Sequence, residues 1–149
     1  MENLAFYFNV SDPMVYVCRL LRKALKKKVK VIVNADESCL NSLDLALWNF
    51  SKTDFLPHCY LDADPILVSR SPILLTTDIQ FTPHEQTLIN LGNHVPEGFL
   101  KFQRVIEIVG KEEDELLNAR DKWKHYKTLG LEITRYDLNH QTIHSYDYP

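Results

Sequence analysis

The chain has 149 residues, of which 45% are hydrophobic and 25% are charged, and these values are ordinary for one soluble globular domain. Its formal net charge of −3 excludes a protein built to coat nucleic acid, and its three widely spaced cysteines argue against disulfides and structural zinc. Because no signal-peptide pattern and no membrane-spanning apolar run is found, we expect a cytoplasmic protein without membrane contact.

Strand and helix patterns alternate in the first fifty residues. Residues 4–8 read LAFYF and predict a buried strand, after which Asp12 and Pro13 predict the start of a helix. Residues 29–33 are apolar and β-branched and predict a second strand, and residues 40–50 predict a second helix. This order is typical of a parallel sheet flanked by helices.

The remaining elements are less regular. Residues 55–60, 73–76 and 87–91 are strand candidates between turns, and residues 102–109 predict a further strand. Residues 111–129 predict a helix, because acidic residues in its first turn and basic residues later match the helix dipole. Residues 131–138 predict a last strand, whereas residues 139–149 show no periodicity. We therefore expect one α/β domain over residues 1–138, followed by a C-terminal tail of unassigned role.

The motifs of cofactor chemistry are not found. The four glycines, at 92, 98, 110 and 130, fit neither GxGxxG nor GxxxxGK(S/T), so we expect no nucleotide-binding loop. No cysteine or histidine spacing is typical of a metal site. We therefore expect no catalytic residues, no metal and no cofactor, and we keep a small-molecule enzyme on an α/β scaffold as an alternative.

Two apolar residues of the second helix lie off its apolar stripe. Leu40, Leu43, Leu47 and Phe50 fall on one side at about 100° per residue, and Leu45 and Trp48 then point to the opposite side. A helix with one core-facing stripe carries polar residues there. Leu45 and Trp48 are therefore covered either by a second layer of this chain or by another protein.

The late helix combines an apolar stripe with cations. Its stripe consists of Leu116, Ala119, Trp123 and Tyr126, and its neighbouring cations are Arg120, Lys124 and Lys127. An apolar groove edged by cations suits an acidic peptide with an aromatic anchor, or a terminal carboxylate. The alternative is a solvated basic face.

A second basic region lies early in the chain. Seven basic residues fall within 12 positions: Arg19, Arg22, Lys23, Lys26, Lys27, Lys28 and Lys30. Residues 19–30 leave a direct nucleic-acid-binding module as a further alternative, for which a steep salt dependence of binding would be the evidence.

In the order and spacing of its motifs, the chain resembles the chi subunit of bacterial DNA polymerase III holoenzyme. The matching motifs are LAFYF, LDLALWNF followed by FLPH, and RVIEIV leading into RDKWKHYKTLG, over about residues 1–138. The resemblance implies a non-catalytic, Rossmann-like α/β domain. It also implies an adaptor that binds the psi subunit of the clamp loader and the acidic C-terminal tail of single-stranded DNA-binding protein.

The resemblance also assigns residues to two binding surfaces. It implies that the surface for psi includes Trp48 and Phe55, and from the pattern of the second helix and the segment after it we expect Leu45 and Leu56 on the same surface. It implies that the groove for the tail includes Val109, Arg120, Trp123 and Lys124, and Trp123 stands where the family commonly has Tyr. From its helical spacing we expect Lys127 in the same groove. Such a protein reaches DNA only indirectly, and family members can also associate with a helicase.

Overall fold

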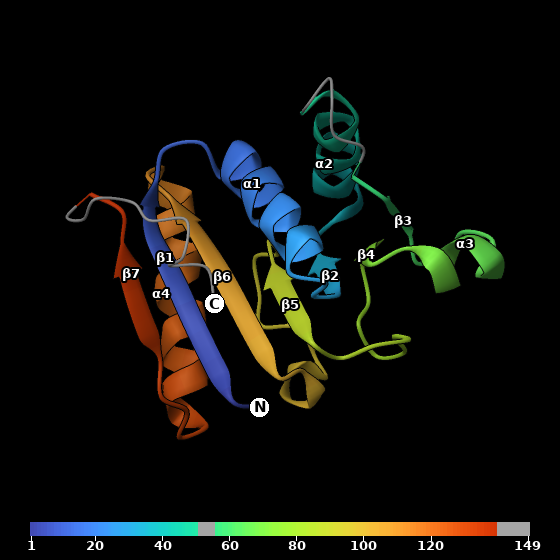
Figure 1. The fold of residues 1–149 in the computed structure, drawn as a ribbon. Helices are drawn as coiled ribbons and strands as arrows, with labels where there is room; N and C mark the ends of the chain where they lie inside the picture. The colour runs from blue at the N-terminus through green and yellow to red at the C-terminus, as the bar shows by residue number, and fades with distance from the viewer. Residues whose placement is uncertain (51–55, 140–149) are drawn as a thin grey trace.

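The computed structural model describes residues 1–50 and 56–139 as helices packed on a single seven-stranded sheet (Figure 1). The predicted single Rossmann-like α/β domain is confirmed, and the strand pairing is parallel throughout, in the order β3-β4-β2-β5-β6-β1-β7. The elements are β1 (Asn3–Val10), α1 (Pro13–Lys26), β2 (Val31–Asn34), α2 (Glu37–Asn49), β3 (His58–Tyr60), α3 (Pro65–Arg70), β4 (Ile73–Thr76), β5 (Thr87–Asn90), a 3-10 turn η1 (Phe99–Lys101), β6 (Arg104–Gly110), α4 (Glu113–Thr128) and β7 (Thr134–Asp137).

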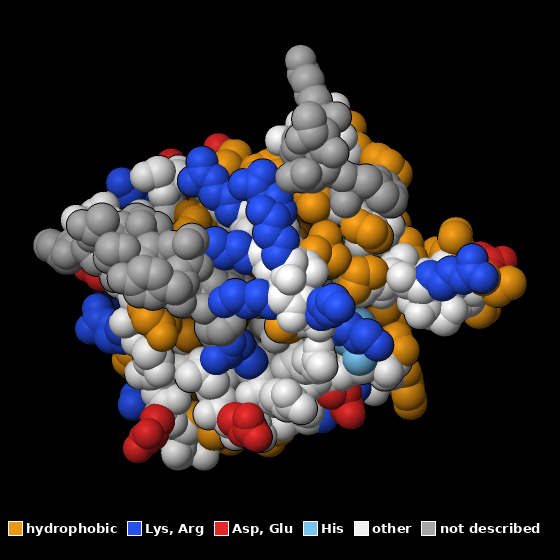
Figure 2. All heavy atoms as spheres, viewed as in Figure 1, with side chains coloured by type: hydrophobic (Ala, Val, Ile, Leu, Met, Phe, Trp, Pro, Cys, Tyr) orange, Lys and Arg blue, Asp and Glu red, His pale blue; other side chains and the backbone are white. Residues whose placement is uncertain are grey.

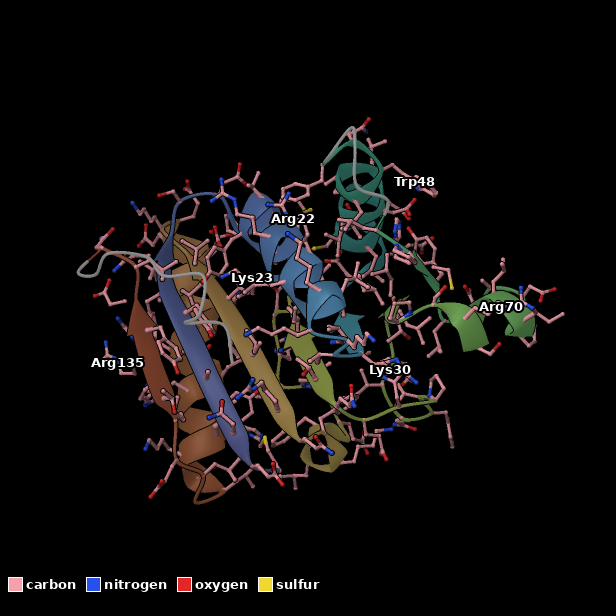
Figure 3. The ribbon with its side chains drawn as sticks, viewed as in Figure 1. Arg22, Lys23, Lys30, Trp48, Arg70 and Arg135 are labelled. Atoms are coloured by element: carbon pink, nitrogen blue, oxygen red, sulfur yellow. The ribbon has the colours of Figure 1, made fainter. Side chains whose placement is uncertain are left out.

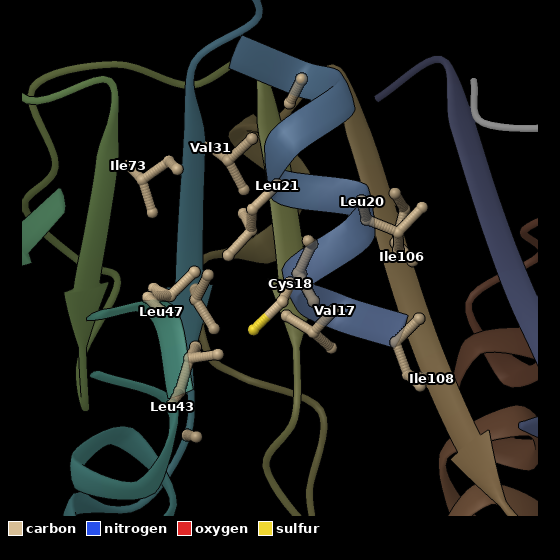
Figure 4. Close-up of a cluster of buried hydrophobic side chains, with 14 of the residues drawn as sticks. Val17, Cys18, Leu20, Leu21, Val31, Leu43, Leu47, Ile73, Ile106 and Ile108 are labelled. Carbon is tan, nitrogen blue, oxygen red and sulfur yellow. The ribbon is translucent and has the colours of Figure 1, made fainter. Parts of the chain in front are cut away.

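Both faces of the sheet are covered, which explains why its inner strands are mostly apolar and buried. In β1, Ala5 and Tyr7 point to one face, whereas Leu4 and Phe6 point to the other. Helices α1 and α2 pack on the first face, where side chains of α1 meet those of β2 and β6 (Figure 4). Helix α4 packs on the second face. The sheet therefore separates the α1–α2 layer from α4.

Aspartates fix the starts of three helices. The Asp12 carboxylate accepts a hydrogen bond from the Val15 backbone N–H at 3.2 Å, and Asp36 accepts one from Cys39 at 2.7 Å. Because Asp36 is the cap, α2 begins at Glu37, three residues before the predicted start. Asp64 accepts a hydrogen bond from the Ile66 N–H at 2.9 Å and caps the short helix α3, which was not predicted from the sequence.

Candidate functional site

The outer side of α2 carries an exposed apolar surface, which we call the Trp48 surface and define as Leu45 and Trp48. Leu43 and Leu47 of the same helix are buried, whereas Leu45 is 64% exposed and Trp48 is 57% exposed. Trp48 lies on the side of α2 away from α1 (Figure 3). The predicted off-stripe geometry is confirmed, and no second layer formed by the described residues buries these two side chains. An exposed tryptophan of this kind is a typical anchor for a protein partner.

A histidine packs beside Trp48. The rings of Trp48 and His58 have centroids 5.2 Å apart. The Nε2 atom of His58 lies 2.8 Å from the Asp44 carboxylate, and its Nδ1 atom lies 2.7 Å from the Leu56 carbonyl oxygen. Because both ring nitrogens have hydrogen-bond partners, the imidazole ring is held in one orientation, in which it packs against the Trp48 ring. No pattern within α2 could have pointed to this support.

The segment before β3 contributes less to the Trp48 surface than was predicted from the sequence. Leu56 is only 3% exposed and belongs to the core under α1 and α2. This corrects its expected role, because a partner bound to the chain would not touch a side chain in the core. Phe55 lies outside the described residues.

The inner side of α4 covers a buried ion pair. Glu107 of β6 is fully buried, and its Oε1 atom accepts a hydrogen bond from the Lys122 Nζ atom at 2.7 Å. Its Oε2 atom accepts from the Tyr126 hydroxyl at 2.6 Å and from the Asn90 side-chain amide at 2.8 Å. With three donors the carboxylate is well satisfied, as a buried charge has to be.

The hydrogen-bond network continues from Glu107 to the ends of two neighbouring strands. Asn90 ends β5 and accepts a hydrogen bond from Asn34, the last residue of β2, at 3.1 Å. Lys122 also donates to the Gly92 carbonyl at 3.0 Å. Burial raises the pKa of Tyr126, and the charge and hydrogen bond of Glu107 raise it further. The network ties α4 to three strands, so it fixes which side of this helix faces outward.

The outer side of α4 carries the second candidate surface. We call it the Trp123 surface and define it as Arg120, Trp123, Lys124 and Lys127. Trp123 is half-buried and packs edge-on against Phe6 of β1, with ring centroids 5.2 Å apart. The three basic residues are exposed, and the Nζ atom of Lys127 lies 5.8 Å from the centroid of the Trp123 ring. The structure therefore brings together four of the five residues predicted for the tail groove.

Val109 is the exception among those five residues. It is 1% exposed and lies in the core on the α4 face of the sheet, in the same cluster that Trp123 packs against. This corrects the expectation that Val109 lines the groove. The residue supports the Trp123 surface from below, because its strand is covered by α4.

One cation of this region was not predicted. Arg135 of β7 is exposed, and its Cζ atom lies 5.7 Å from the centroid of the Trp123 ring and 5.2 Å from that of Phe8. These distances are typical of cation–π contacts. Figure 3 shows Arg135 at the edge strand of the sheet. Sequence spacing could not find this residue, because β7 reaches Trp123 only through its pairing with β1.

The carboxyl edge of the sheet, where α/β folds usually bind ligands, has the wrong charge for a nucleotide. An open cavity of about 580 Å³ lies there between the ends of β2, β4 and β5. Its lining includes Asp36, Glu37, Asp78 and Glu97 and, within the described residues, no lysine or arginine. Four carboxylates would repel phosphate groups, so the cavity does not favour the enzyme alternative in its nucleotide-binding form.

The described residues contain neither a candidate metal site nor a candidate membrane-spanning helix. In residues 1–50 and 56–139, no group of three or more His, Cys, Asp or Glu side chains is arranged to hold a metal ion. No helix of the same residues has the length and apolar character that a membrane crossing requires.

Comparison with known proteins identifies relatives over nearly the whole chain. The family model described as DNA polymerase III chi subunit, HolC, matches residues 1–134. The DNA polymerase III subunit chi of Pseudomonas aeruginosa is 32% identical over 143 residues, which cover 93% of this chain and 98% of that protein. The C-terminal domain of the DEAD-box protein Dbp5 superposes with a TM-score of 0.57, covering 93% of this chain and 91% of that domain. At 13% identity, this last likeness shows the fold alone.

Proposed function

The chain belongs to the DNA polymerase III chi subunit family, and from this premise we propose that it is a non-catalytic adaptor with two protein partners. One partner is the psi subunit of the clamp loader, bound through the Trp48 surface. The other is the acidic C-terminal tail of single-stranded DNA-binding protein, bound through the Trp123 surface. A helicase is a further candidate partner, and DNA is reached through the bound proteins.

The observation that carries this proposal is the separation of the two surfaces by the sheet. Helix α2 packs on one face of the sheet and α4 packs on the other. A partner on α2 therefore leaves α4 accessible, which is what an adaptor between two proteins requires. Both surfaces carry an aromatic side chain that touches neighbouring rings within the chain, so little side-chain entropy is lost on binding.

The Trp48 surface suits a lasting interface with psi. Leu45 and Trp48 together expose apolar side chains that water solvates poorly, and both would be buried by a partner. Trp48 is the stronger candidate anchor, because tryptophan is enriched among residues that dominate binding energy. Phe55, the other residue implied by the resemblance, stays a prediction.

The Trp123 surface suits reversible binding of an acidic tail. Phe8 and Trp123 supply an apolar wall for an aromatic side chain. Arg120 and Lys124 are exposed, and neither forms an ion pair with another described residue. An arginine can hold a carboxylate through two parallel hydrogen bonds, so Arg120 is assigned to the terminal carboxylate or to an acidic side chain. Because a flexible peptide has to be ordered, micromolar affinity is expected.

The test for the tail is a titration with a fluorescent acidic peptide that ends in Pro-Phe. We expect saturable binding that weakens with salt, and no binding of a peptide that lacks the final Phe. Arg120→Ala should lower the affinity by roughly tenfold or more, because a charge-assisted hydrogen bond contributes about 1.5–3 kcal/mol. Arg70→Ala, which removes an exposed arginine of α3, is the matched control. Equal affinities of the two variants would refute the groove assignment.

The test for psi is a pull-down and calorimetric titration with Trp48→Ala. We expect this variant to lose about 2 kcal/mol or more of psi affinity. Its affinity for the tail peptide should not change, because α4 lies across the sheet. Conversely, Arg120→Ala should bind psi normally. If either variant lost both partners, the proposal of two independent surfaces would be wrong.

A further inference from the structure

The outward side of α1 forms a basic row that the adaptor role does not use. Arg19, Arg22, Lys23 and Lys26 follow one another at helical spacing, and Lys27, Lys28 and Lys30 continue the row beyond the helix. No acidic residue occurs between Asp12 and Asp36. Lys and Arg side chains gather over α1 on this face of the molecule (Figure 2), where Figure 3 marks Arg22, Lys23 and Lys30.

We propose that this row, from Arg19 to Lys30, binds the phosphate backbone of DNA directly and without reading its sequence. The proposal goes beyond the adaptor function, in which DNA is reached only through other proteins. It also does not depend on the tail groove, because α1 and α4 lie on opposite faces of the sheet.

The burial of α1 explains why its charges are arranged in a row. Leu20, Leu21 and Ala24 face the sheet and are at most 3% exposed, so the cations can only occupy the other side. At a rise of 1.5 Å per residue, the helical part from Arg19 to Lys26 is about 10 Å long. A surface of that length, extended by Lys27, Lys28 and Lys30, can contact several successive phosphates rather than a single anion.

One cation of the row is held in position. The Cζ atom of Arg22 lies 5.0 Å from the centroid of the Phe50 ring, which belongs to the end of α2. This contact orients the guanidinium at the junction of the two helices. A guanidinium kept in one orientation loses less freedom when it binds a phosphate.

The composition of the row favours DNA over an acidic protein. Five of its seven cations are lysines, and lysine is depleted in protein–protein interfaces because its ammonium group is strongly hydrated. Hydrated lysines suit phosphate contacts, where affinity comes from the release of counterions. The whole chain has a net charge of −3, so any attraction to DNA has to come from a local patch such as this one.

The experiment measures fluorescence anisotropy of a labelled thymidine oligonucleotide, alone and as a duplex of the same length, at increasing NaCl. The wild-type chain should bind at low salt, with a Kd that rises as salt increases and reaches roughly 10⁻⁴–10⁻⁶ M at physiological salt. Circular dichroism of each variant establishes that the fold is intact.

The decisive comparison uses two charge-matched pairs of substitutions. Arg19→Gln with Lys26→Gln should reduce the salt slope for the single strand by about 1.4 and lower the affinity at low salt by roughly tenfold or more. Arg70→Gln with Lys111→Gln removes the same charge from exposed positions elsewhere and should leave both values unchanged. The proposal is overturned by equal losses in the two pairs, by failure of the wild type to bind DNA at low salt, or by polyglutamate competing as well as DNA.

Discussion

Replacing Lys122 by Met would test whether the buried ion pair holds α4 on the sheet. Methionine keeps the apolar length of the side chain but removes the hydrogen bonds from Nζ to Glu107 and to the Gly92 carbonyl. Glu107 would then remain a fully buried carboxylate with two donors, the Tyr126 hydroxyl and the Asn90 amide. We expect the folded state to be strongly destabilised.

The size of the effect follows from the burial of both partners. Removing one partner of a buried pair costs about 3–5 kcal/mol, because the remaining charge is left without compensation. Domains of this kind are stable by only about 5–15 kcal/mol, so the loss is a large fraction of the total. The midpoint of thermal unfolding should fall by roughly 10 °C. Urea unfolding followed by tryptophan fluorescence gives the free energy, and calorimetry gives the midpoint.

Two further variants separate the ion pair from a general effect of the substitution. Lys124→Met changes an exposed lysine of the same helix and should alter stability by no more than about 0.5 kcal/mol. Adding Glu107→Gln to Lys122→Met should recover part of the loss, because the neutral amide is cheaper to bury. A loss below about 1 kcal/mol for Lys122→Met, or a further loss in the double variant, would refute this account of the network.

Three more outcomes are expected. Since the pKa of Tyr126 is raised above 10.0 in the folded chain, stability in urea should fall as pH rises above about 10, and Tyr126→Phe should flatten that fall. Burial raises the pKa of Cys18 to about 11, and the charge of Asp12 contributes, so the Cys18 thiol should react with Ellman's reagent only when the chain unfolds. The folded Cys18→Ser variant should therefore have the same number of rapidly reacting thiols as the folded wild type, and one fewer would contradict this expectation. Leu43→Ala should cost about 2–5 kcal/mol in urea unfolding, whereas Leu45→Ala should cost no more than about 0.5 kcal/mol, and similar costs would contradict the orientation of α2.

Local patterns predicted most of the fold, because the sheet is buried on both faces. Each run of apolar residues that predicts a strand overlaps a strand of the structure, from β1 to β7. The missed helix α3 has only six residues, too few for a periodic pattern, although Asp64 and Pro65 are the cap and first residue of a typical helix start. A helix this short can be recognised in a sequence only by the capping residues at its start.

The candidate surfaces were predicted less completely, because burial depends on distant partners. Trp48 could be placed opposite the buried stripe of its helix, but the pattern left open whether another layer of the chain covers it; the structure shows it 57% exposed. Glu107 could not be assigned to the interior, since its burial depends on donors from other elements, among them Lys122, fifteen residues later. Arg135 joins Trp123 only through the pairing of β7 with β1. Spacing along one element therefore finds a surface, but not the residues that other strands bring to it.

Because β1 lies between β6 and β7 in the sheet, it is synthesised on the ribosome long before either of its neighbours. Residues 3–10 pair with residues 104–110 on one side and 134–137 on the other. At about 5–20 residues per second, roughly 5–20 s separate the synthesis of β1 from that of its first neighbour. During that time the LAFYF segment has no sheet partner, whereas β2, β4 and β5 are all made before β6 and can pair with one another first. The N-terminal strand β1 is therefore the part of the nascent chain most prone to aggregate, because it is apolar and unpaired. A chaperone at the exit of the ribosomal tunnel would protect this segment most.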